Sequence, residues 1–538
     1  MFRKLCGFSP VLVIIARNFP VRSLHLPSDF PSAASVSPGR GALISAPRLQ
    51  NLPKGYKMEK ILSARRREWM ESTQQKNDFT QGSIAKNILS LAIPMTIAQL
   101  TNVLYNVVDR AYIGHIEGIG RDALTGIGLA MPIISIVTAF TNLCGMGGAP
   151  LCSIARGRGD REGAQRVMGN AFVLLLVLGV VLMAVFYSFL DPILYLVGGS
   201  YTTVFYARQY LLIYLAGTIP VMIALGLNPF INSQGFGRTG MMTVLLGAVM
   251  NLVLDPIFIF ALHMDVAGAA LATVLSQICS AAWVLRFLTG QKAILRLERR
   301  YIRLHLPTVG RITALGLSGF TFSITNSLVQ GSGNALLQHY GTLEGGTVLG
   351  DLYVSAMTVI SSVREIIYQP IQGLTQGAQP VLGYNYGAGR YSRVRQCIRF
   401  MTLASLICNV VMWALVMAWP EMWILLFNND LALQEIGAVT MRIYFCAYFF
   451  MSFQSAGQYT FVALGQAKKA VFFSLLRKVI LVVPLMYLLP GLTGLGAYGV
   501  FAAEPISDMV GGLICYTTML LTVWRQLKQP DRLDGGQA

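Results

Sequence analysis

Twelve long apolar runs follow one another along the chain, separated by short polar stretches. Each is long enough to cross a bilayer, which takes about 20 residues as a helix. A crossing segment must satisfy its own backbone hydrogen bonds, so the pattern predicts an all-α polytopic membrane protein, with bends where proline interrupts a run. The predicted spans are 87–113, 123–150, 165–190, 202–230, 239–262, 266–289, 311–339, 350–378, 394–420, 434–463, 470–490 and 494–523.

Basic residues gather in alternate connections between these spans. They follow the second, fourth, sixth, eighth and tenth spans and recur in the tail, whereas the odd-numbered connections hold few. We count Lys468, Lys469, Arg477 and Lys478 toward the connection after the tenth span. Because positive residues are retained on the cytoplasmic side, both termini and all even connections are expected in the cytoplasm.

The second half of the chain repeats the first at an offset of 230 residues. Matched prolines and glycines sit at the ends of corresponding spans, as in Pro150 and Pro380, Gly157 and Gly387, Gly159 and Gly389, and the turn glycines Gly235 and Gly465. Six spans per copy give both copies the same orientation, which predicts two parallel six-helix halves related by a pseudo-two-fold axis along the membrane normal. Substrate is expected between the halves.

Composition supports a membrane protein and excludes other classes. Only 12% of the residues are charged, against about 25% in a soluble chain, so a soluble enzyme, a disordered chain and a fibrous protein are excluded. The net charge of +18 is interpreted as a topology signal rather than as affinity for nucleic acid. The eight cysteines form no CxxC pair, so neither a zinc site nor a disulfide framework is predicted.

The spans divide the chain into six segments. A purine-rich codon pair for Lys54-Gly55 lies shortly before the codon of Met58, so we expect translation to start at Met58 and the basic extension before it to be poorly ordered. The segments are the extension 1–57, a cytoplasmic lead-in 58–85, the first six-helix lobe 86–290, a basic cytoplasmic linker 291–310, the second six-helix lobe 311–524 and a cytoplasmic tail 525–538.

Carboxylates inside the first and fifth spans are the leading functional candidates, because charges within a bilayer are costly. Asp109 and Asp255 fall within roughly 10 Å of the outer membrane edge, as does Thr273. Asn251 and Tyr105 each stand four residues before a carboxylate and share its helix face. Such an oxygen-rich set suits a hard cation, Na⁺, or a proton shared by two carboxylates. The alternative is an interfacial anchor at Asp109 and a capped bend at Asp255.

A second group of candidates lies in the seventh and eighth spans. Arg364 and Glu365 are charged residues in mid-span, and Glu365 is expected to face the cavity and attract cationic substrate. Asn326, Gln330 and Asn334 follow one another at intervals of four and so share a helix face. A buried ion pair, or a polar face that joins helices, is the alternative.

The tenth and twelfth spans add further polar positions. The tenth combines aromatic residues with Gln454, and its Tyr448 is a candidate cavity residue that could hold apolar cations by cation–π contact. In the twelfth span, Glu504 and Asp508 are four residues apart and share a face. The sequence contains no phosphate-binding loop, zinc-protease motif or nucleophile elbow, so neither an enzyme nor a cofactor is predicted.

Several motifs, in order along residues 80–525, resemble the multidrug and toxic compound extrusion (MATE) family, bacterial type. They are Ile93-Pro94 with Asp109, the RGRGD loop at 156–160, NLVLDPIF at 251–258, GAALAT at 268–273 and QGAQPVLGYNYGAG at 376–389. The resemblance implies a coupling-cation site at Asp109, Asn251, Asp255 and Thr273, with a carbonyl from Ala269 and with Tyr105 and Tyr210 nearby. Some members also carry an acid in the seventh or tenth span; in this chain the seventh has none and the tenth has only Glu435 at its very start, so Glu365 is the nearest substitute.

From the residues and the resemblance together, we expect a monomeric secondary transporter in the inner (cytoplasmic) cell membrane. It would export organic cations and drugs by antiport with Na⁺ or H⁺, without a cofactor or nucleic-acid partner. A flippase for lipid-linked oligosaccharides, which would share the fold, is the alternative. The cavity of such a flippase should be rich in Arg and Lys, whereas acids outnumber basic residues among these candidates.

Overall fold

The computed structural model describes residues 77–116, 119–198, 200–427 and 430–531. They all belong to one compact unit, residues 66–538. The expected extension 1–57, the lead-in up to residue 76 and the end of the tail lie outside the described residues.

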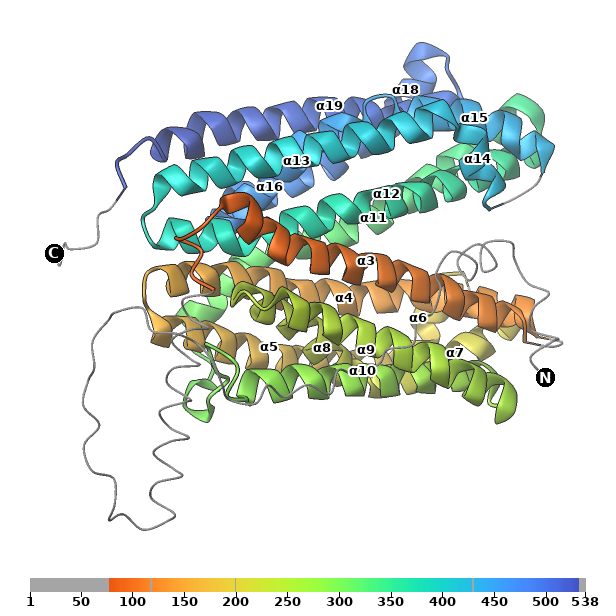
Figure 1. The fold of residues 1–538 in the computed structure, drawn as a ribbon. Coiled ribbons are helices and arrows are strands. Elements are labelled where there is room, and N and C mark those ends of the chain that lie inside the picture. Colours follow the sequence, from red (N-terminus) through yellow and green to blue (C-terminus); the bar gives the residue numbers. More distant parts are fainter. Residues whose placement is uncertain (1–76, 117–118, 199, 428–429, 532–538) are drawn as a thin grey trace, which may run out of the picture. The chain divides into compact units, whose positions relative to one another are not determined.

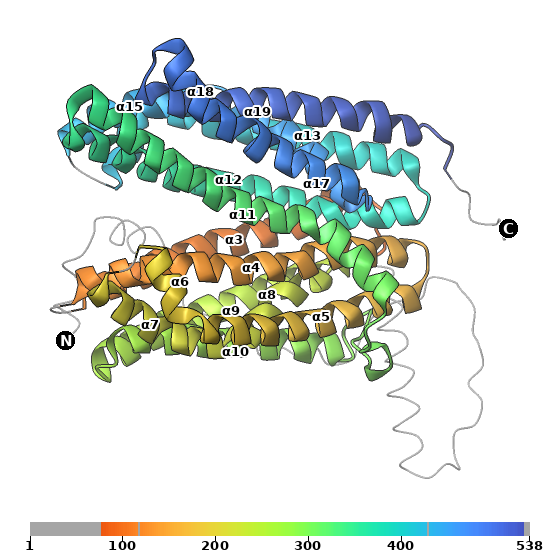
Figure 2. The ribbon, with the colours of Figure 1, turned by 180° about the vertical axis from the view of Figure 1, so that it is seen from behind.

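The described chain is built from helices gathered in two bundles (Figures 1 and 2). The first lobe consists of α3 (Ile84–Gly114), α4 (Gly120–Gly157), α5 (Arg161–Ser188), α6 (Leu190–Leu196), α7 (Tyr201–Ala216), α8 (Thr218–Ser233), α9 (Gly237–Pro256) and α10 (Asp265–Thr289). The second lobe consists of α11 (Leu306–Gly345), α12 (Thr347–Gly387), α13 (Tyr391–Ala418), α14 (Pro420–Leu425), α15 (Leu431–Phe445), α16 (Met451–Ala463), α17 (Ala467–Leu475), α18 (Val483–Thr493) and α19 (Ala497–Met519).

Each predicted span corresponds to one of these helices or to a consecutive pair of them. Within the described residues, ten helices are long and apolar enough to cross a membrane, and the pair α7 and α8 makes an eleventh. The twelfth is α12, which has 41 residues but carries Arg364, Glu365 and four glutamines. Gln372, Gln376 and Gln379 line the cavity between the lobes, and Arg364 pairs with acids of its own lobe, so α12 is the span that hydropathy alone detects least well.

The fourth predicted span is broken rather than gently bent. The axes of α7 and α8 differ by 60° at Gly217. Pro220 lies in the first turn of α8, where its missing N–H leaves the preceding turn without a donor. By contrast, α3 continues through Pro94, and α12 continues through both of its prolines. Proline therefore marks only some of the bends.

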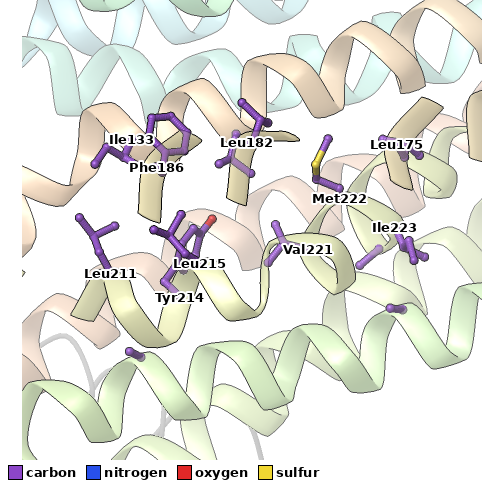
Figure 3. Packing of buried hydrophobic residues seen from close by; sticks show 14 of the residues in the cluster. Ile133, Leu175, Leu182, Phe186, Leu211, Tyr214, Leu215, Val221, Met222 and Ile223 are labelled. Carbon is purple, nitrogen blue, oxygen red and sulfur yellow. The ribbon is translucent and has the colours of Figure 1, made fainter. Parts of the chain in front are cut away.

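Each lobe encloses an apolar core, and Figure 3 shows part of the core of the first lobe. Ile133 and Leu175 from α4 and α5 pack there with Leu215 and Met222 from α7 and α8. Small and branched side chains from four helices thus meet without a polar partner. Close packing of this kind holds membrane helices together, because apolar side chains are not driven out of lipid by the hydrophobic effect as they are out of water.

The internal repeat reappears in the backbone. Gly159 and Gly389, which terminate matching spans, have φ of +76° and +70°. Gly235 and Gly465, at the matching turns after α8 and α16, have φ of +91° and +73°. Left-handed conformations of this kind favour glycine strongly. The repeated glycines therefore conserve the same turns in both lobes.

Reciprocal contacts join the lobes at one end, where α4 and α12 finish. We call this the inner end, and the opposite end, where α3 finishes, the outer end. A Cβ added to Gly157 would lie 2.0 Å from the carbonyl oxygen of Tyr384, and one added to Gly387 would lie 2.1 Å from that of Ile154. The two contacts exchange residues 230 positions apart, as a pseudo-two-fold axis requires.

A second reciprocal pair lies further into the bundles. A Cβ on Gly316 of α11 would lie 1.8 Å from the carbonyl oxygen of Leu143 in α4. In the mirrored contact, a Cβ on Gly373 of α12 would lie 2.7 Å from the backbone of Thr96 in α3. Only residues without a side chain permit such close backbone approach. The lobes therefore meet along seams of bare backbone.

The predicted linker 291–310 is shorter than expected and packs against the first lobe. Helix α11 begins at Leu306, with Pro307 in its first turn, a position that proline favours. Leu295 and Tyr301 of the linker are buried. The backbone N–H of His305 donates to Oδ1 of Asn170 in α5 at 2.6 Å. The linker is therefore anchored on the first lobe before α11 starts.

Candidate functional site

A cavity of about 460 Å³ lies between the two lobes. The first lobe lines it with residues from α3, α4, α8, α9 and α10, and the second lobe with residues from α11, α12, α16 and α17. Two hydrogen bonds cross from lobe to lobe beside it. Gln99 donates to Gln376 at 3.3 Å, and Asn142 donates to Ser323 at 3.4 Å. The cavity is thus placed where the internal repeat predicts a substrate site.

The cavity wall is polar but almost free of charge. Among the described residues that line it, Arg477 is the one charged side chain. The wall is rich in carboxamides, and some of their buried oxygens accept no hydrogen bond from the described residues; these are Oδ1 of Asn228 and Asn232 and Oε1 of Gln454 and Gln458. Buried acceptors are normally paired. These oxygens lie just behind the cavity surface and give the wall negative partial charge.

The structure brings the predicted first-lobe residues together. Nδ2 of Asn251 donates to Oδ1 of Asp255 at 3.2 Å and to Oγ1 of Thr273 at 3.3 Å. The carboxyl groups of Asp109 and Asp255 approach closely enough for a hydrogen bond between them. Tyr210 lies within hydrogen-bonding reach of Thr273. Four helices, α3, α7, α9 and α10, thus supply one cluster, which we call the carboxylate cluster.

The carboxylate cluster opens onto the cavity through its uncharged members. Tyr105, Asn251 and Thr273 line the cavity, whereas Asp255 is buried behind them with 1% of its surface exposed. One buried oxygen of Asp109 and one of Asp255 accept no hydrogen bond from the described residues. An ion arriving from the cavity would therefore meet neutral oxygen ligands first and the carboxylates second.

Ala269 lies one helical turn before Thr273 on α10 and is buried. A π-helical stretch, Ile257–Ala261, follows the Asp255-Pro256 step. Irregular turns of this kind are frequent at functional sites, because they aim backbone groups away from the regular ladder.

The structure places most of the predicted second-lobe residues outside the cavity wall. Glu365 is exposed and does not line the cavity. Asn326 and Gln330 are exposed as well, and Asn334 lies further along the same helix, also off the wall. Arg364 lies in the other direction from Glu365 and is buried in the second lobe. Neighbouring helical positions point about 100° apart, so only one of the two could face inward.

Arg364 belongs to a buried network of five charged side chains, which we call the charge cluster. Its Nη1 lies 2.5 Å from Oε1 of Glu504, and its Nη2 lies 3.6 Å from Oδ1 of Asp508. Nη1 of Arg477 lies 2.7 Å from Oδ1 of Asp508, and Nζ of Lys478 lies 2.6 Å from Oε1 of Glu504. The shared face predicted for Glu504 and Asp508 is confirmed by their common arginine partners.

The assignment of Arg477 and Lys478 to a cytoplasmic connection was wrong. Both are buried, at 3% and 5% exposure, in the π-helical stretch Leu476–Val482 between α17 and α18. Their carboxylate partners keep these cations inside the bundle, and a count of basic residues near a span end cannot detect such partners. The available signal was that both fall inside the predicted span 470–490, with two acids in the next span.

The two remaining cavity candidates, Gln454 and Tyr448, lie in different surroundings. Gln454 lines the cavity, and its Nε2 donates to the carbonyl oxygen of Phe473 at 3.4 Å. Tyr448 is buried within the second lobe, and its hydroxyl has no hydrogen-bond partner among the described residues. Tyr444 takes the position beside the guanidinium, accepting a hydrogen bond from Nη1 of Arg364 at 2.7 Å. Tyr448 is therefore a core residue.

A short segment before α3, residues 77–82, ties the lobes together at the inner end. Arg156 of α4 donates to the carbonyl oxygen of Asn77 at 2.5 Å and to that of Ser233 at 3.1 Å. Its guanidinium also covers the rings of Phe79 and Tyr384, at 5.4 Å and 4.8 Å. We call this contact the inner latch, because it joins α4 and α8 of one lobe to α12 of the other.

Comparison with known proteins identifies a family and relatives for this chain. The profile of the MatE family matches residues 94–257 and 341–488. The multidrug export protein MepA of Staphylococcus saprophyticus is 24% identical over 440 residues, covering 81% of this chain and 95% of that protein. Its counterpart in Staphylococcus aureus is 23% identical over the same length. Both names describe drug export, and neither supports the oligosaccharide flippase.

Solved structures share the fold. One described as the outward-facing conformation of a multidrug resistance MATE family transporter superimposes with a TM-score of 0.77, at 22% identity, covering 84% of this chain and 98% of that one. A second, described as a MATE in complex with MaL6, gives the same TM-score and covers 99% of its chain. The predicted all-α fold of twelve spanning helices in two halves is confirmed.

Proposed function

Because the chain belongs to the MatE family of multi-pass membrane transporters, we propose that it exports drug-like organic molecules, organic cations among them, by antiport with Na⁺ or H⁺. The observation that carries the proposal is the adjacency of two sites. The carboxylate cluster shares Tyr105, Asn251 and Thr273 with the wall of the cavity between the lobes. One conformational change could therefore couple occupancy of the cluster to occupancy of the cavity.

The carboxylate cluster suits a driving ion. Two carboxyl groups close to each other in a low dielectric resist double ionisation, so one of them holds a proton or both share a cation. Oxygen ligands from Asn251 and Thr273 complete a set that a hard cation prefers. Na⁺ or H⁺ bound at Asp109 and Asp255 would neutralise the same charge, and either would remove the repulsion between the two carboxylates.

The cavity wall suits organic cations through rings and dipoles rather than through acids. Tyr105, Phe322, Tyr368 and Tyr459 present aromatic surfaces, and an aromatic face attracts a cation with about 0.5–2 kcal/mol. The unpaired carboxamide oxygens described above add negative partial charge. Uncharged acceptors accommodate ligands of varied shape, because no single ion pair fixes the orientation of the substrate.

The reciprocal glycine contacts support an outward-open state for this structure. They lie at the inner end, next to the Arg-rich connections after α4 and α12 that the positive-inside rule assigns to the cytoplasm. With the inner end sealed, the cavity can communicate only with the outer side. We place both termini in the cytoplasm of a monomer in the cell membrane, with lobe boundaries near residues 86–290 and 311–524.

Dye efflux from proteoliposomes, driven by a Na⁺ gradient in one series and a pH gradient in another, tests the proposal. Asp109→Asn and Asp255→Asn should each abolish gradient-driven export at unchanged protein level. The double variant should be no worse than either, because both residues act on one bound ion. Asp191→Asn is the matched control, since Asp191 is exposed and pairs with Arg208 at 3.2 Å. Full gradient-driven export by the double variant would refute the proposed coupling site.

A further inference from the structure

The charge cluster of the second lobe contains more basic than acidic side chains. Arg364, Arg477 and Lys478 are three cations, and Glu504 and Asp508 are two carboxylates. All five side chains lie inside the lobe, with 15% exposure for Arg364 and less for the others. A buried charge without a counter-ion is expensive. An anionic group that approaches from the nearest solvent-filled space would therefore find basic partners in this cluster.

That space is the cavity, and Arg477 is the member of the charge cluster that reaches it. Nη1 of Arg477 is engaged by Asp508 at 2.7 Å and more weakly by Glu504 at 3.4 Å. Every hydrogen bond of this guanidinium given by the structure is made through that one nitrogen. A guanidinium has donors on its other nitrogens, arranged in a fork that matches a carboxylate. The cavity side of Arg477 can therefore receive a planar anion.

The wall beside Arg477 is polar enough to complete such a subsite. Tyr368, Gln454 and Ser455 line the cavity there, and the hydroxyl of Tyr368 lies within hydrogen-bonding reach of Ser455. Buried Oγ of Ser455 makes no direct hydrogen bond by strict geometry to the described residues. Hydroxyl groups can donate to an anion, so these residues would satisfy the carboxylate oxygens that Arg477 leaves unpaired.

Among its described residues, the first lobe presents no charged side chain to the cavity. At the repeat offset of 230 residues, Arg477 and Lys478 correspond to Gly247 and Ala248, and Gly247 also lines the cavity. The two faces of the cavity therefore differ in chemistry: the first lobe offers a carboxylate cluster behind neutral ligands, and the second lobe offers a guanidinium. A substrate that carries both signs of charge would find a complementary partner on each side.

The matching helices α10 and α19 show that the two clusters occupy related places. Gly268 and Gly499, 231 positions apart, are both pressed against backbone of the preceding helical segment, at 2.8 Å and 2.7 Å from an added Cβ. Five residues further on, α10 carries Thr273 of the carboxylate cluster and α19 carries Glu504 of the charge cluster. The repeat thus positions one polar centre per lobe, acidic in the first lobe and mixed, with more basic than acidic side chains, in the second.

We propose that the cavity side of Arg477 is a subsite for an anionic group, a carboxylate or sulfonate, on the transported molecule, so that zwitterionic amphiphiles are preferred substrates. The inference rests on the proposed export function and adds to it the substrate class. The cationic end of such a molecule lies against the aromatic rings and carboxamide oxygens of the wall. Its anionic end lies at the second lobe, against the cavity side of Arg477.

Two dyes that differ only in this group provide the test. Rhodamine B is a zwitterion, and its ethyl ester has the same cationic ring system without the carboxylate. Their dissociation constants are measured by fluorescence anisotropy on the purified full chain in one detergent. A charge-assisted hydrogen bond contributes enough to change affinity about tenfold. We expect the wild-type chain to bind rhodamine B about tenfold more tightly than the ester, and Arg477→Gln to erase that preference.

Two further variants keep the test decisive. Arg477→Gln together with Asp508→Asn removes both partners of one ion pair, so Asp508 is not left as a buried carboxylate without Arg477 and a folded protein is favoured; it should also erase the preference. Arg442→Gln is the matched control, because Arg442 is about half exposed and pairs with Glu421 on the surface; it should retain the preference.

Equal affinity of the wild-type chain for the two dyes would overturn the subsite, and so would a preference for rhodamine B that survives the double substitution. A chain that binds and exports neither dye would contradict the export function itself. Export of both dyes at equal affinity would leave the export function intact and refute only the subsite.

Discussion

The seam between α4 and α11 is predicted to control which end of the transporter is open. Gly316→Ala places a methyl group 1.8 Å from the carbonyl oxygen of Leu143. Gly331→Ala, on the same helix, is the matched control, because a Cβ there would meet nothing within 4 Å. Both substitutions raise the helix propensity of α11 equally. Any difference between them therefore reports the contact between the lobes.

The geometry sets the size of the effect. Ordinary van der Waals contact begins at 3.4 Å, so the Gly316→Ala methyl group must move away from 1.8 Å by about 1.6 Å. The atoms that this methyl group meets are backbone atoms of Leu143, which cannot move away by a change of rotamer. Overpacking of a close contact costs about 1–3 kcal/mol, which corresponds to a roughly 5- to 160-fold change in the ratio of two conformations. The clash exists only while the inner end is closed, so Gly316→Ala should increase the population of the inner-open state.

Spin-label distances across the outer end measure that ratio. Leu196 on α6 and Leu431 on α15 lie at the outer ends of the two lobes, and both side chains are exposed, at 86% and 76%. With labels at these positions in a background without other reactive cysteines, Gly316→Ala should add a population at shorter distance, because rigid lobes that part at one end approach at the other. A distance distribution identical to that of Gly331→Ala would show that the seam does not govern the equilibrium.

Two other substitutions test the buried polar contacts. Arg364→Gln removes one partner of Glu504 and Asp508 and should lower the free energy of unfolding by about 3 kcal/mol in reversible unfolding in mixed micelles, whereas Arg442→Gln at the surface should lower it by less than about 1 kcal/mol; equal effects would contradict the buried role of the charge cluster. Arg156→Gln removes the hydrogen bonds and ring contacts of the inner latch and should shift the same spin-label distances toward the inner-open state, while Arg158→Gln, which is exposed, should not.

The apolar pattern predicted the helices well because every span must bury its own backbone in lipid. The limits of α3 and α10 agree with the predicted spans to within a few residues. The carboxylate cluster was also predictable, since Asp109, Asp255 and Thr273 have similar depths and periodicity places Asn251 on the face of Asp255. Depth and helix face are both properties that a sequence contains.

What the sequence did not reveal is which way a helix faces its neighbours. Arg364 and Glu365 are adjacent, and the choice of the one that points into the bundle depends on α19, which brings Glu504 and Asp508 to meet it. The burial of Arg477 has the same cause. Likewise, the 60° break at Gly217 could not be distinguished from the bends expected at other prolines, because tertiary contacts decide whether a helix continues through them.

The bare-backbone seams have a consequence for the speed of the transport cycle. Interlocked side chains must leave their rotamer wells before two helices can separate, which adds friction to the motion. At Gly157, Gly387 and Gly316 the lobes touch through main-chain atoms, which have no rotamers to change. The two backbones at the seam cannot come closer together, but the lobes can slide along it or separate with little resistance from side chains. The surrounding lipid adds no hydrophobic attraction between the lobes. Such a seam therefore permits rapid interconversion between the inner-open and outer-open states while each lobe stays rigid.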